Sequence, residues 1–245
     1  MPYVALRNHS HYSLLDGTMP VDEIVQAAVE FGMPAVGLVD RDTVAGAVQF
    51  YKKARAAGIH PVIGSEVTIE GGGTLVLLVE NAEGYSNLCR LLTTRIEHPD
   101  GVTVDDLNLF RAGLICLCGA EGPAYREIYG PNFAFEISPH NAEDLRRARS
   151  LAALGRRLRI PVVATAHAHY RAPEDRLFYD ILASMRTLTM LSQAHPEKHG
   201  AGAFHLHPPR KMKRLLRDLP RLRRARLAER AAKRGCSHIR GTQRV

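Results

Sequence analysis

The sequence predicts an α/β fold in which strands and helices alternate around a parallel sheet or small barrel. Short apolar runs rich in Val and Ile alternate along the chain with longer segments whose apolar residues recur at helical period, which is typical of repeated βα units. The chain has 245 residues, of which 45% are hydrophobic and 24% charged, an ordinary composition for a globular protein with one sizeable core. We therefore expect one α/β domain, with or without a tail.

Seven apolar runs have the length and composition expected of buried strands. They lie at residues 4–6, 35–39, 61–69, 75–79, 114–117, 134–137 and 162–164. The run Gly71-Gly72-Gly73 separates the third strand from the fourth. It is expected to form a hairpin turn, because glycine adopts the positive φ that such turns need.

The clearest helix is expected over residues 20–31. Val21, Ile24 and Val25 fall on one stripe of this segment, which begins with a proline and is followed by a glycine, and these are matched start and stop signals. Further helices are expected at residues 45–57, 81–94, 142–158 and 173–188. The first three of these lie between two strands, as the crossover connections of a parallel sheet do.

Positive charge is concentrated at the C-terminal end of the chain. Residues 210–245 contain 14 Lys or Arg against 2 Asp or Glu, a net charge of +12, so the preceding residues carry −4 and the whole chain +8. The segment before this tail loses periodicity and gathers Gly, Pro and His, which is typical of a linker. We therefore expect a folded domain over residues 1–186, a linker over 187–208 and a basic, partly helical tail over 209–245.

The sequence gives no sign of export or of membrane insertion. Its first residues lack a basic segment followed by an apolar one, and no run approaches the roughly 18 apolar residues of a membrane span. The four cysteines form no Cys-x-x-Cys pair, so we expect reduced core residues rather than a zinc finger. These features favour a cytoplasmic location and no membrane partner.

Polar residues at the ends of the predicted strands suggest a site. In a parallel barrel the carboxyl ends of the strands meet on one face, so residues distant in sequence can form one pocket. Histidines and carboxylates without a thiolate suit Zn, Mn or Fe in a hydrolytic site better than a structural zinc site. The candidates are His9, His11, Asp16, Asp40, Glu66, His167 and His169.

Simpler roles are open for each of these residues. The alternative role is a loop cap for His11, a hydrogen-bonded structural histidine for His167, and a cap of the following helix for Asp40. Glu66 stands alone in an apolar strand, and a buried carboxylate needs a partner. That partner is a metal ion or, alternatively, the guanidinium group of Arg7 or Arg41.

Several motifs resemble those of a known family. The runs NHSHYSLLDG, GMPAVGLVDRDTVAGAVQFYKKARAAGIHPVIGSEV, NLCRLL and PVVATAHAHYRAPED resemble the PHP (polymerase and histidinol phosphatase) domain at the N-terminus of bacterial DNA polymerase III alpha chains, especially the error-prone branch. GAFHLHPPRKMKRLLRDLP resembles the stretch that leads from that domain toward the polymerase palm. The resemblance implies a distorted (β/α)7-type PHP barrel with a basic tail and without the palm.

The resemblance also implies a partial set of metal ligands. Four family ligand positions are kept, by His9, Asp16, Glu66 and His169, while His11 and His167 are possible substitutes. Other ligand positions are occupied by Arg7, Arg41, Thr94 and Ala120, and each arginine adds positive charge where ligands should offset that of a metal. We expect at most one weakly held divalent ion, Zn or Mn, with Asp40 orienting a ligand in any catalysis.

Three functional hypotheses follow from this resemblance. The first is a degenerate PHP domain with a structural or accessory role in DNA replication or translesion repair, without polymerase activity, that binds DNA and a separately encoded polymerase or replisome component. The second is a metal-dependent phosphoesterase or 3′–5′ exonuclease, and the third is a truncated remnant of a polymerase gene. Sequence-independent contacts to DNA phosphates are expected from Lys211, Lys213, Arg214, Arg217, Arg221, Arg223 and Arg224.

Overall fold

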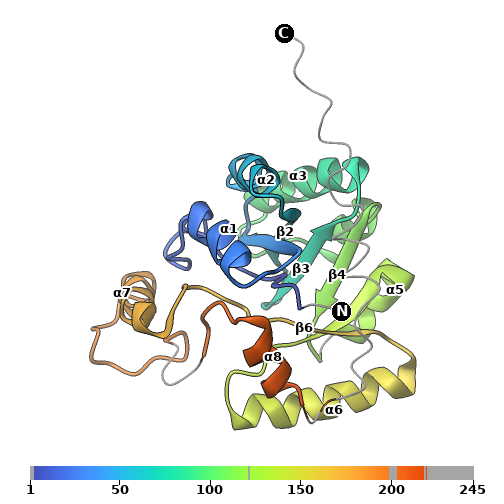
Figure 1. Ribbon diagram of the computed structural model, residues 1–245. Helices are drawn as coiled ribbons and strands as arrows, with labels where there is room; N and C mark the ends of the chain where they lie inside the picture. The colour runs from blue at the N-terminus through green and yellow to red at the C-terminus, as the bar shows by residue number, and fades with distance from the viewer. Residues whose placement is uncertain (1–2, 121, 199–202, 218, 220–245) are drawn as a thin grey trace.

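A computed structural model describes residues 3–120, 122–198, 203–217 and 219 of the chain. Its described part contains a single curled sheet of six strands in sequential order, surrounded by helices (Figure 1). The strands are β1 (Ala35–Arg41), β2 (His60–Thr68), β3 (Thr74–Val79), β4 (Leu114–Cys118), β5 (Phe133–Ile137) and β6 (Val162–Ala164). The predicted α/β class is therefore confirmed.

The helices of the described residues lie before the first strand, between the strands and after the last of them. They are α1 (Val21–Glu30), α2 (Ala47–Ala56), α3 (Ala82–Glu97), α4 (Val104–Leu109), α5 (Tyr125–Tyr129), α6 (Ala142–Leu158), α7 (Arg176–Thr187) and α8 (Pro209–Leu215). The five predicted helices correspond to α1, α2, α3, α6 and α7, and the expected helical part of the tail begins with α8. None of the helices in the described residues combines the length and apolar character that crossing a bilayer requires.

The sheet is mixed rather than wholly parallel. β1 pairs with β2, β4 with β5 and β5 with β6 in parallel, whereas β3 is antiparallel to both of its neighbours. The turn between β2 and β3 contains Gly71, Gly72 and Gly73, all at positive φ, as the glycine run predicted. The expectation that α3 is a crossover between parallel strands was wrong, because β3 and β4, which it joins, run antiparallel.

Residues 5–8 close the sheet, although they do not form the regular strand predicted there. Ala5 forms a parallel bridge with Val36 of β1, and Asn8 forms one with Ala168, beyond β6. This segment forms hydrogen bonds with both edges of the sheet. At the β1 edge the Gly37 amide donates to the Ala5 carbonyl, and at the β6 edge the Ala168 amide donates to the Arg7 carbonyl. Gly37 permits the close approach, since a Cβ there would lie 2.0 Å from the Leu6 carbonyl oxygen.

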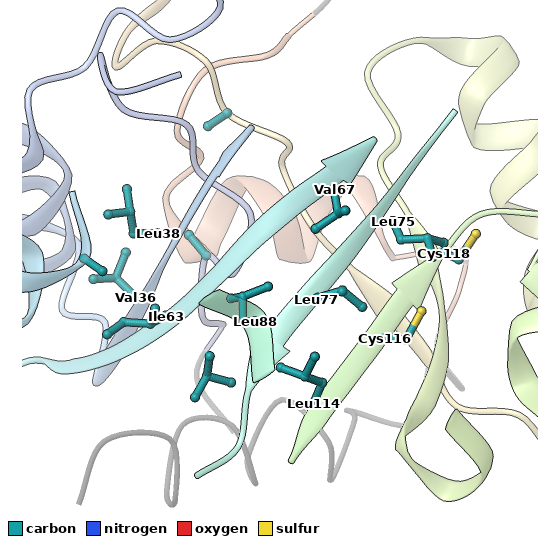
Figure 2. Packing of buried hydrophobic residues seen from close by; sticks show 14 of the residues in the cluster. Val36, Leu38, Ile63, Val67, Leu75, Leu77, Leu88, Leu114, Cys116 and Cys118 are labelled. Carbon is teal, nitrogen blue, oxygen red and sulfur yellow. The ribbon is translucent and has the colours of Figure 1, made fainter. Parts of the chain in front are cut away.

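Apolar side chains fill both faces of the sheet. On the outer face Val36, Ile63, Leu77 and Cys116 pack beneath the surrounding helices, with Leu88 of α3 among them (Figure 2). On the inner face Val62, Leu78, Ile115, Ala134 and Val163 form a second cluster. Full burial of one such aliphatic side chain contributes about 1.5–3 kcal/mol, so the two clusters hold the sheet in its curled form.

The cysteines match the sequence expectation where the structure describes them. Cys116 and Cys118 are buried in β4, Cys89 is half-buried, and none of these three forms a disulfide. Cys236 lies outside the described residues.

Candidate functional site

Two carboxylates face the barrel interior because of strand alternation. Side chains two residues apart on a strand share a face, so the register that turns Val62 and Ala134 inward also turns Glu66 and Glu136 inward. Both glutamates are buried. Each occurs near the carboxyl end of its strand, which is the barrel face expected to carry the site.

Arg7 joins these two carboxylates across the barrel. Its Nη2 lies 2.7 Å from Glu66 Oε2 and its Nη1 lies 2.7 Å from Glu136 Oε2. Its Nε donates a further hydrogen bond of 3.2 Å to Glu66. The guanidinium fork therefore acts as an internal cation, and removing one partner of such a buried pair costs about 3–5 kcal/mol.

His9 faces Glu66 from the loop after the closing segment. Ser13 Oγ donates to Asp40 Oδ1 over 2.7 Å, so this hydroxyl accepts from His9 Nδ1, 3.2 Å away. This tautomer would leave a lone pair on His9 Nε2, which lies 3.0 Å from Glu66 Oε2. Two acceptors at that distance require a proton on Nε2 or a cation that both atoms contact.

Asp40 organises the loop that carries His9. Its buried carboxylate accepts hydrogen bonds from the Ser10 amide at 2.6 Å, the Ser10 hydroxyl at 2.8 Å and the Ser13 hydroxyl at 2.7 Å. Asp40 therefore reaches the site through Ser13, and its contacts are those of a positioning residue.

His167 and His169 complete a group of three histidines with His9. Each of the three offers a ring nitrogen, and these nitrogens lie within 4.8 Å of one another. The rings of His9 and His169 are stacked with centroids 4.4 Å apart. His167 has a φ of +44°, a left-handed conformation that is uncommon outside glycine. This conformation turns the backbone between β6 and His169, so that the rings of His167 and His169 both lie beside His9.

Asp16 is held from three sides. Arg186 Nη1 of α7 lies 2.9 Å from Asp16 Oδ1, and Arg41 Nη2 lies 3.4 Å from Oδ2. His169 Nδ1 contacts the Asp16 carbonyl oxygen at 3.0 Å, which places the lone pair of that ring on Nε2. Arg41 also lies 3.5 Å from Glu66 Oε1.

The pKa values of the central groups follow from this arrangement. Burial alone would raise the pKa of Glu66, but the charge of Arg7 and contacts from His167 and His9 outweigh it and hold that pKa well below its ordinary value. Burial, reinforced by the charge of Arg7, holds the pKa of His167 well below 6.5. Glu66 is therefore ionised and His167 neutral at pH 7.

A single divalent ion fits the three histidines better than a cluster of ions does. Zinc lies about 2.0–2.2 Å from nitrogen and oxygen ligands, which is compatible with the 3.0 Å between His9 Nε2 and Glu66 Oε2. A cluster needs several carboxylates, yet Glu66, Glu136 and Asp16 each contact a guanidinium group. The three arginines balance the three acids, so the charge that would hold further ions is already neutralised.

The other predicted positions lie apart from this group. His11 is exposed, and its ring lies against Tyr12 with centroids 4.5 Å apart. Thr94 donates to a carbonyl within α3, and Ala120 is exposed beyond β4. Lys211 of α8 contacts His205 Nε2 at 2.7 Å. Lys213, Arg214 and Arg217 are exposed, whereas Arg221, Arg223 and Arg224 lie outside the described residues.

Sequence reasoning missed Glu136 and Arg186. Glu136 carried the same signal as Glu66, a single acid in the apolar strand FAFEI, and could have been found by it. Arg186 had no comparable signal, since arginine on a surface helix is ordinary and its contact with Asp16 spans 170 residues.

The fold and the site together define an α/β-barrel protein with histidines and carboxylates gathered at one end of its strands. The family model for the PHP domain matches residues 5–147, which is more than half of the chain. The chain therefore belongs to the PHP domain family, as the sequence motifs indicated.

Curated relatives are bacterial DNA polymerases. The chain is 33% identical to the error-prone DNA polymerase of Symbiobacterium thermophilum over 90% of its own length and 24% of that protein. It is 28% identical to the DNA polymerase III subunit alpha of Borreliella burgdorferi, over 89% of this chain and 22% of the relative. The chain thus spans about a quarter or less of the length of these relatives.

Two solved structures resemble this chain at low sequence identity. An amidohydrolase from Chromobacterium violaceum, solved with bound sulfate and no metal, matches with a TM-score of 0.54 and 13% identity, over 68% of this chain and 87% of that one. A putative metal-dependent phosphoesterase from Bifidobacterium adolescentis matches with a TM-score of 0.47 and 14% identity, over 69% of this chain and 89% of that one.

Proposed function

We propose that this chain is an accessory PHP domain of the DNA polymerase III alpha type, with a structural role in DNA replication or translesion repair and no polymerase activity. The observation that carries the proposal is the pairing of the acidic side chains with arginine. Glu66 and Glu136 contact Arg7, and Asp16 contacts Arg41 and Arg186. A site neutralised in this way favours stability of the barrel over the binding of several catalytic ions.

The division of the chain supports the same proposal. Residues 1–186 would form the PHP domain, residues 187–208 the linker, and the basic residues 209–245 the beginning of a connection toward a polymerase palm. The basic segment would contact DNA, and a separately encoded polymerase or replisome component would be the protein partner. The similarity to polymerases over most of this chain supports that choice of partner. A truncated gene remnant would share these features but would retain neither partner.

Two measurements test the accessory role. Tagged protein, isolated from its own cells, is expected to retain a polymerase of the DNA polymerase III alpha or error-prone type that mass spectrometry identifies. The purified chain is expected to leave a 3′-labelled DNA strand intact in the presence of Mn or Zn. Retention of no such polymerase would contradict the accessory role and favour the gene remnant.

The three histidines support a second candidate function, a metal-dependent phosphoesterase or 3′–5′ exonuclease. His9, His167 and His169 would hold one ion, with Zn favoured over Mn by the nitrogen-rich ligand set. Glu66 would be the nearest carboxylate, Asp16 would orient His169, and Asp40 would position His9 through Ser13. Such an ion supplies an activated water when it is bound.

Metal content separates the two candidates. Elemental analysis of wild-type protein purified without chelator is compared with His169→Ala and, as a matched control outside the group of three, His11→Ala. The phosphoesterase gains support if one ion per chain is present, disappears in His169→Ala and persists in His11→Ala, together with cleavage of DNA ends. Wild-type protein without bound metal and without cleavage would rule it out.

A further inference from the structure

The exposed face of α6 carries a stripe of arginines. At 100° per residue, Arg146 and Arg157 lie within about 20° of each other around the helix, and Arg149 and Arg156 lie within about 20° of each other beside them. All four are exposed, while the opposite side of α6 buries Ala148, Leu151 and Gly155. We call these four residues, Arg146, Arg149, Arg156 and Arg157, the α6 stripe.

Acidic residues do not offset this charge along the helix. Residues 145–160 contain six arginines and no Asp or Glu. The acids of α6 lie in its first turn, where Glu143 forms an i,i+4 ion pair with Arg147. Within the described part of the chain, Arg146, Arg156 and Arg157 have no ion pair. A solvated helix face usually mixes both signs of charge, so a face of one sign indicates an anionic partner.

An open groove borders the stripe on one side. It has a volume of about 750 Å³ and lies between α6 and the carboxyl ends of β4 and β5. Its lining includes the charged side chains of Arg146 and Arg147, the apolar Leu151 and Leu154, and Glu136 and Ser138 at the ends of the strands. Among the described residues, no element covers the stripe on the side of this groove, and α6 lies at the edge of the molecule (Figure 1).

We propose that the α6 stripe binds the phosphate backbone of DNA. The choice of DNA among polyanions rests on the proposed function, whereas the binding surface rests on the arrangement of α6. From Arg146 to Arg157 the stripe rises about 16 Å, a length that faces about four or five phosphates of one strand. Arginine forks suit phosphate oxygens, and the groove lining contains no aromatic side chain for base stacking. The binding is therefore independent of base sequence.

This surface is separate from the basic tail. The stripe belongs to the body of the domain, which apart from residues 210–245 carries a net charge of −4. The positive face of α6 is thus a local concentration of charge on a domain whose net charge is negative. A DNA strand bound there passes beside the groove whose lining includes Glu136, the carboxylate that lies 2.7 Å from Arg7.

Fluorescence anisotropy with labelled single- and double-stranded DNA tests the proposal on the full chain. The variant Arg149→Gln/Arg156→Gln/Arg157→Gln is compared with a control that loses the same charge from exposed positions of α2 and α3, Lys52→Gln/Arg55→Gln/Arg90→Gln. These helices lie on the opposite side of the domain from α6 (Figure 1). A third variant, Arg221→Gln/Arg223→Gln/Arg224→Gln, removes charge from the tail. Thermal melting confirms that each variant is folded.

The α6 variant is expected to weaken binding about tenfold or more at low salt and to reduce the slope of log K against log salt by about 2–3. The control should stay within about twofold of wild type, because its charges lie on the opposite side of the domain and neutralise no phosphate of DNA bound at α6. A loss of affinity in the α6 variant no larger than in the control overturns the proposal. A loss confined to the tail variant also overturns it and would assign DNA binding to the tail instead. Absence of DNA binding by the wild type overturns it too, while the accessory role is judged separately by the co-purified polymerase.

Discussion

Arg7 is the residue on which the interior of the barrel depends. Its three nitrogens are used in contacts to Glu66 and Glu136, two inward-facing carboxylates on different strands. Burial alone would lower the pKa of Arg7, but the charges of Glu136 and Glu66 raise it further above its ordinary value. The guanidinium group is therefore a permanent cation in a largely buried position, with only 11% of the side chain exposed.

The first prediction is that Arg7→Met lowers the free energy of unfolding by about 3–5 kcal/mol at pH 7, because it removes the cation that two buried carboxylates share. Urea denaturation measures the change. Arg171→Met serves as a control, since the ion pair of Arg171 with Glu30 lies at the surface and is worth about 0–1 kcal/mol. Equal losses in the two variants would contradict the assigned role of Arg7.

The second prediction concerns how that loss depends on pH. The folded-state pKa of Glu66 is depressed, so its stabilising contribution is complete above the unfolded-state pKa of about 4.3 and is lost as pH falls through the folded value. In Arg7→Met the two carboxylates lose their shared guanidinium group, so proton binding by them stabilises the folded state. The difference between wild type and variant should therefore shrink between pH 7 and pH 4, and a constant difference would contradict the pairing.

Part of this network could be predicted from single residues. Glu66 stood out because a lone acid in an apolar strand needs a partner, and the alternative partners considered, Arg7 and Arg41, both contact it. The second carboxylate of the bridge, Glu136, was not recognised. Which of two arginines approaches a given acid depends on the closure of the barrel, which local sequence does not encode.

Helix α7 contributes to the site from outside the sheet. Its Arg186 lies 2.9 Å from Asp16 and 2.7 Å from Glu197, and its Tyr179 packs edge-on against His169 with centroids 5.1 Å apart. The opposite face of the helix, with Leu177, is exposed. These polar contacts therefore supplement a small apolar interface in holding α7 against the barrel.

The third prediction is that Arg186→Gln loosens α7 selectively. Losing charged hydrogen bonds of this kind costs about 1.5–3 kcal/mol, so hydrogen exchange of α7 amides should quicken about 10- to 100-fold, while the amides of β1 and β2 keep their protection. Arg176→Gln on the same helix is the matched control, because its i,i+4 partner Asp180 forms a surface pair. Uniform loss of protection would show that Arg186 supports the whole barrel instead.

Sequence signals located elements better than strand directions. The helix expected at residues 142–158 has those bounds, because Asn141 caps its start with hydrogen bonds to two amides and Arg159 ends it in a left-handed conformation. The antiparallel direction of β3 relative to β4 was not foreseen, since apolar periodicity is the same for either direction. Residues 4–6, which overlap the closing segment, were predicted to form a strand because their apolar character, not their hydrogen bonding, is visible in sequence.

The whole molecule combines a neutral interior with an uneven surface charge. Three arginines balance three acids within the site, whereas the exterior concentrates arginine on α6 and basic residues around α8. The segment 203–207 connects these regions to the site, because Phe204 stacks on His140 with centroids 3.6 Å apart and the His169 amide donates to the Phe204 carbonyl. Histidines in this segment make the fold sensitive to acid.

The fourth prediction follows from His207, whose side chain is buried and whose ring nitrogens make no hydrogen bond within the described residues. Burial, and then the charges of His205 and Lys211, lower its pKa to about 3. Burial and Lys211 likewise lower the pKa of His205 to about 4. These folded-state pKa values lie below the unfolded-state value of about 6.5. The contribution of the two neutral rings to the unfolding free energy is therefore fully present above pH 6.5 and is lost as pH falls toward 4.

Wild-type protein should therefore lose unfolding free energy between pH 7 and pH 5, by about 1–2 kcal/mol for each such histidine. His207→Leu should match or exceed wild-type stability at pH 7, because it replaces a buried ring that has no hydrogen bond with an apolar side chain. Its loss of unfolding free energy between pH 7 and pH 5 should be smaller than that of wild type by about 1–2 kcal/mol, the contribution of one histidine. The exposed His11→Leu control should lose as much as wild type. Urea denaturation at both pH values measures these differences, and an undiminished loss in His207→Leu would show that the acid sensitivity arises elsewhere in the barrel.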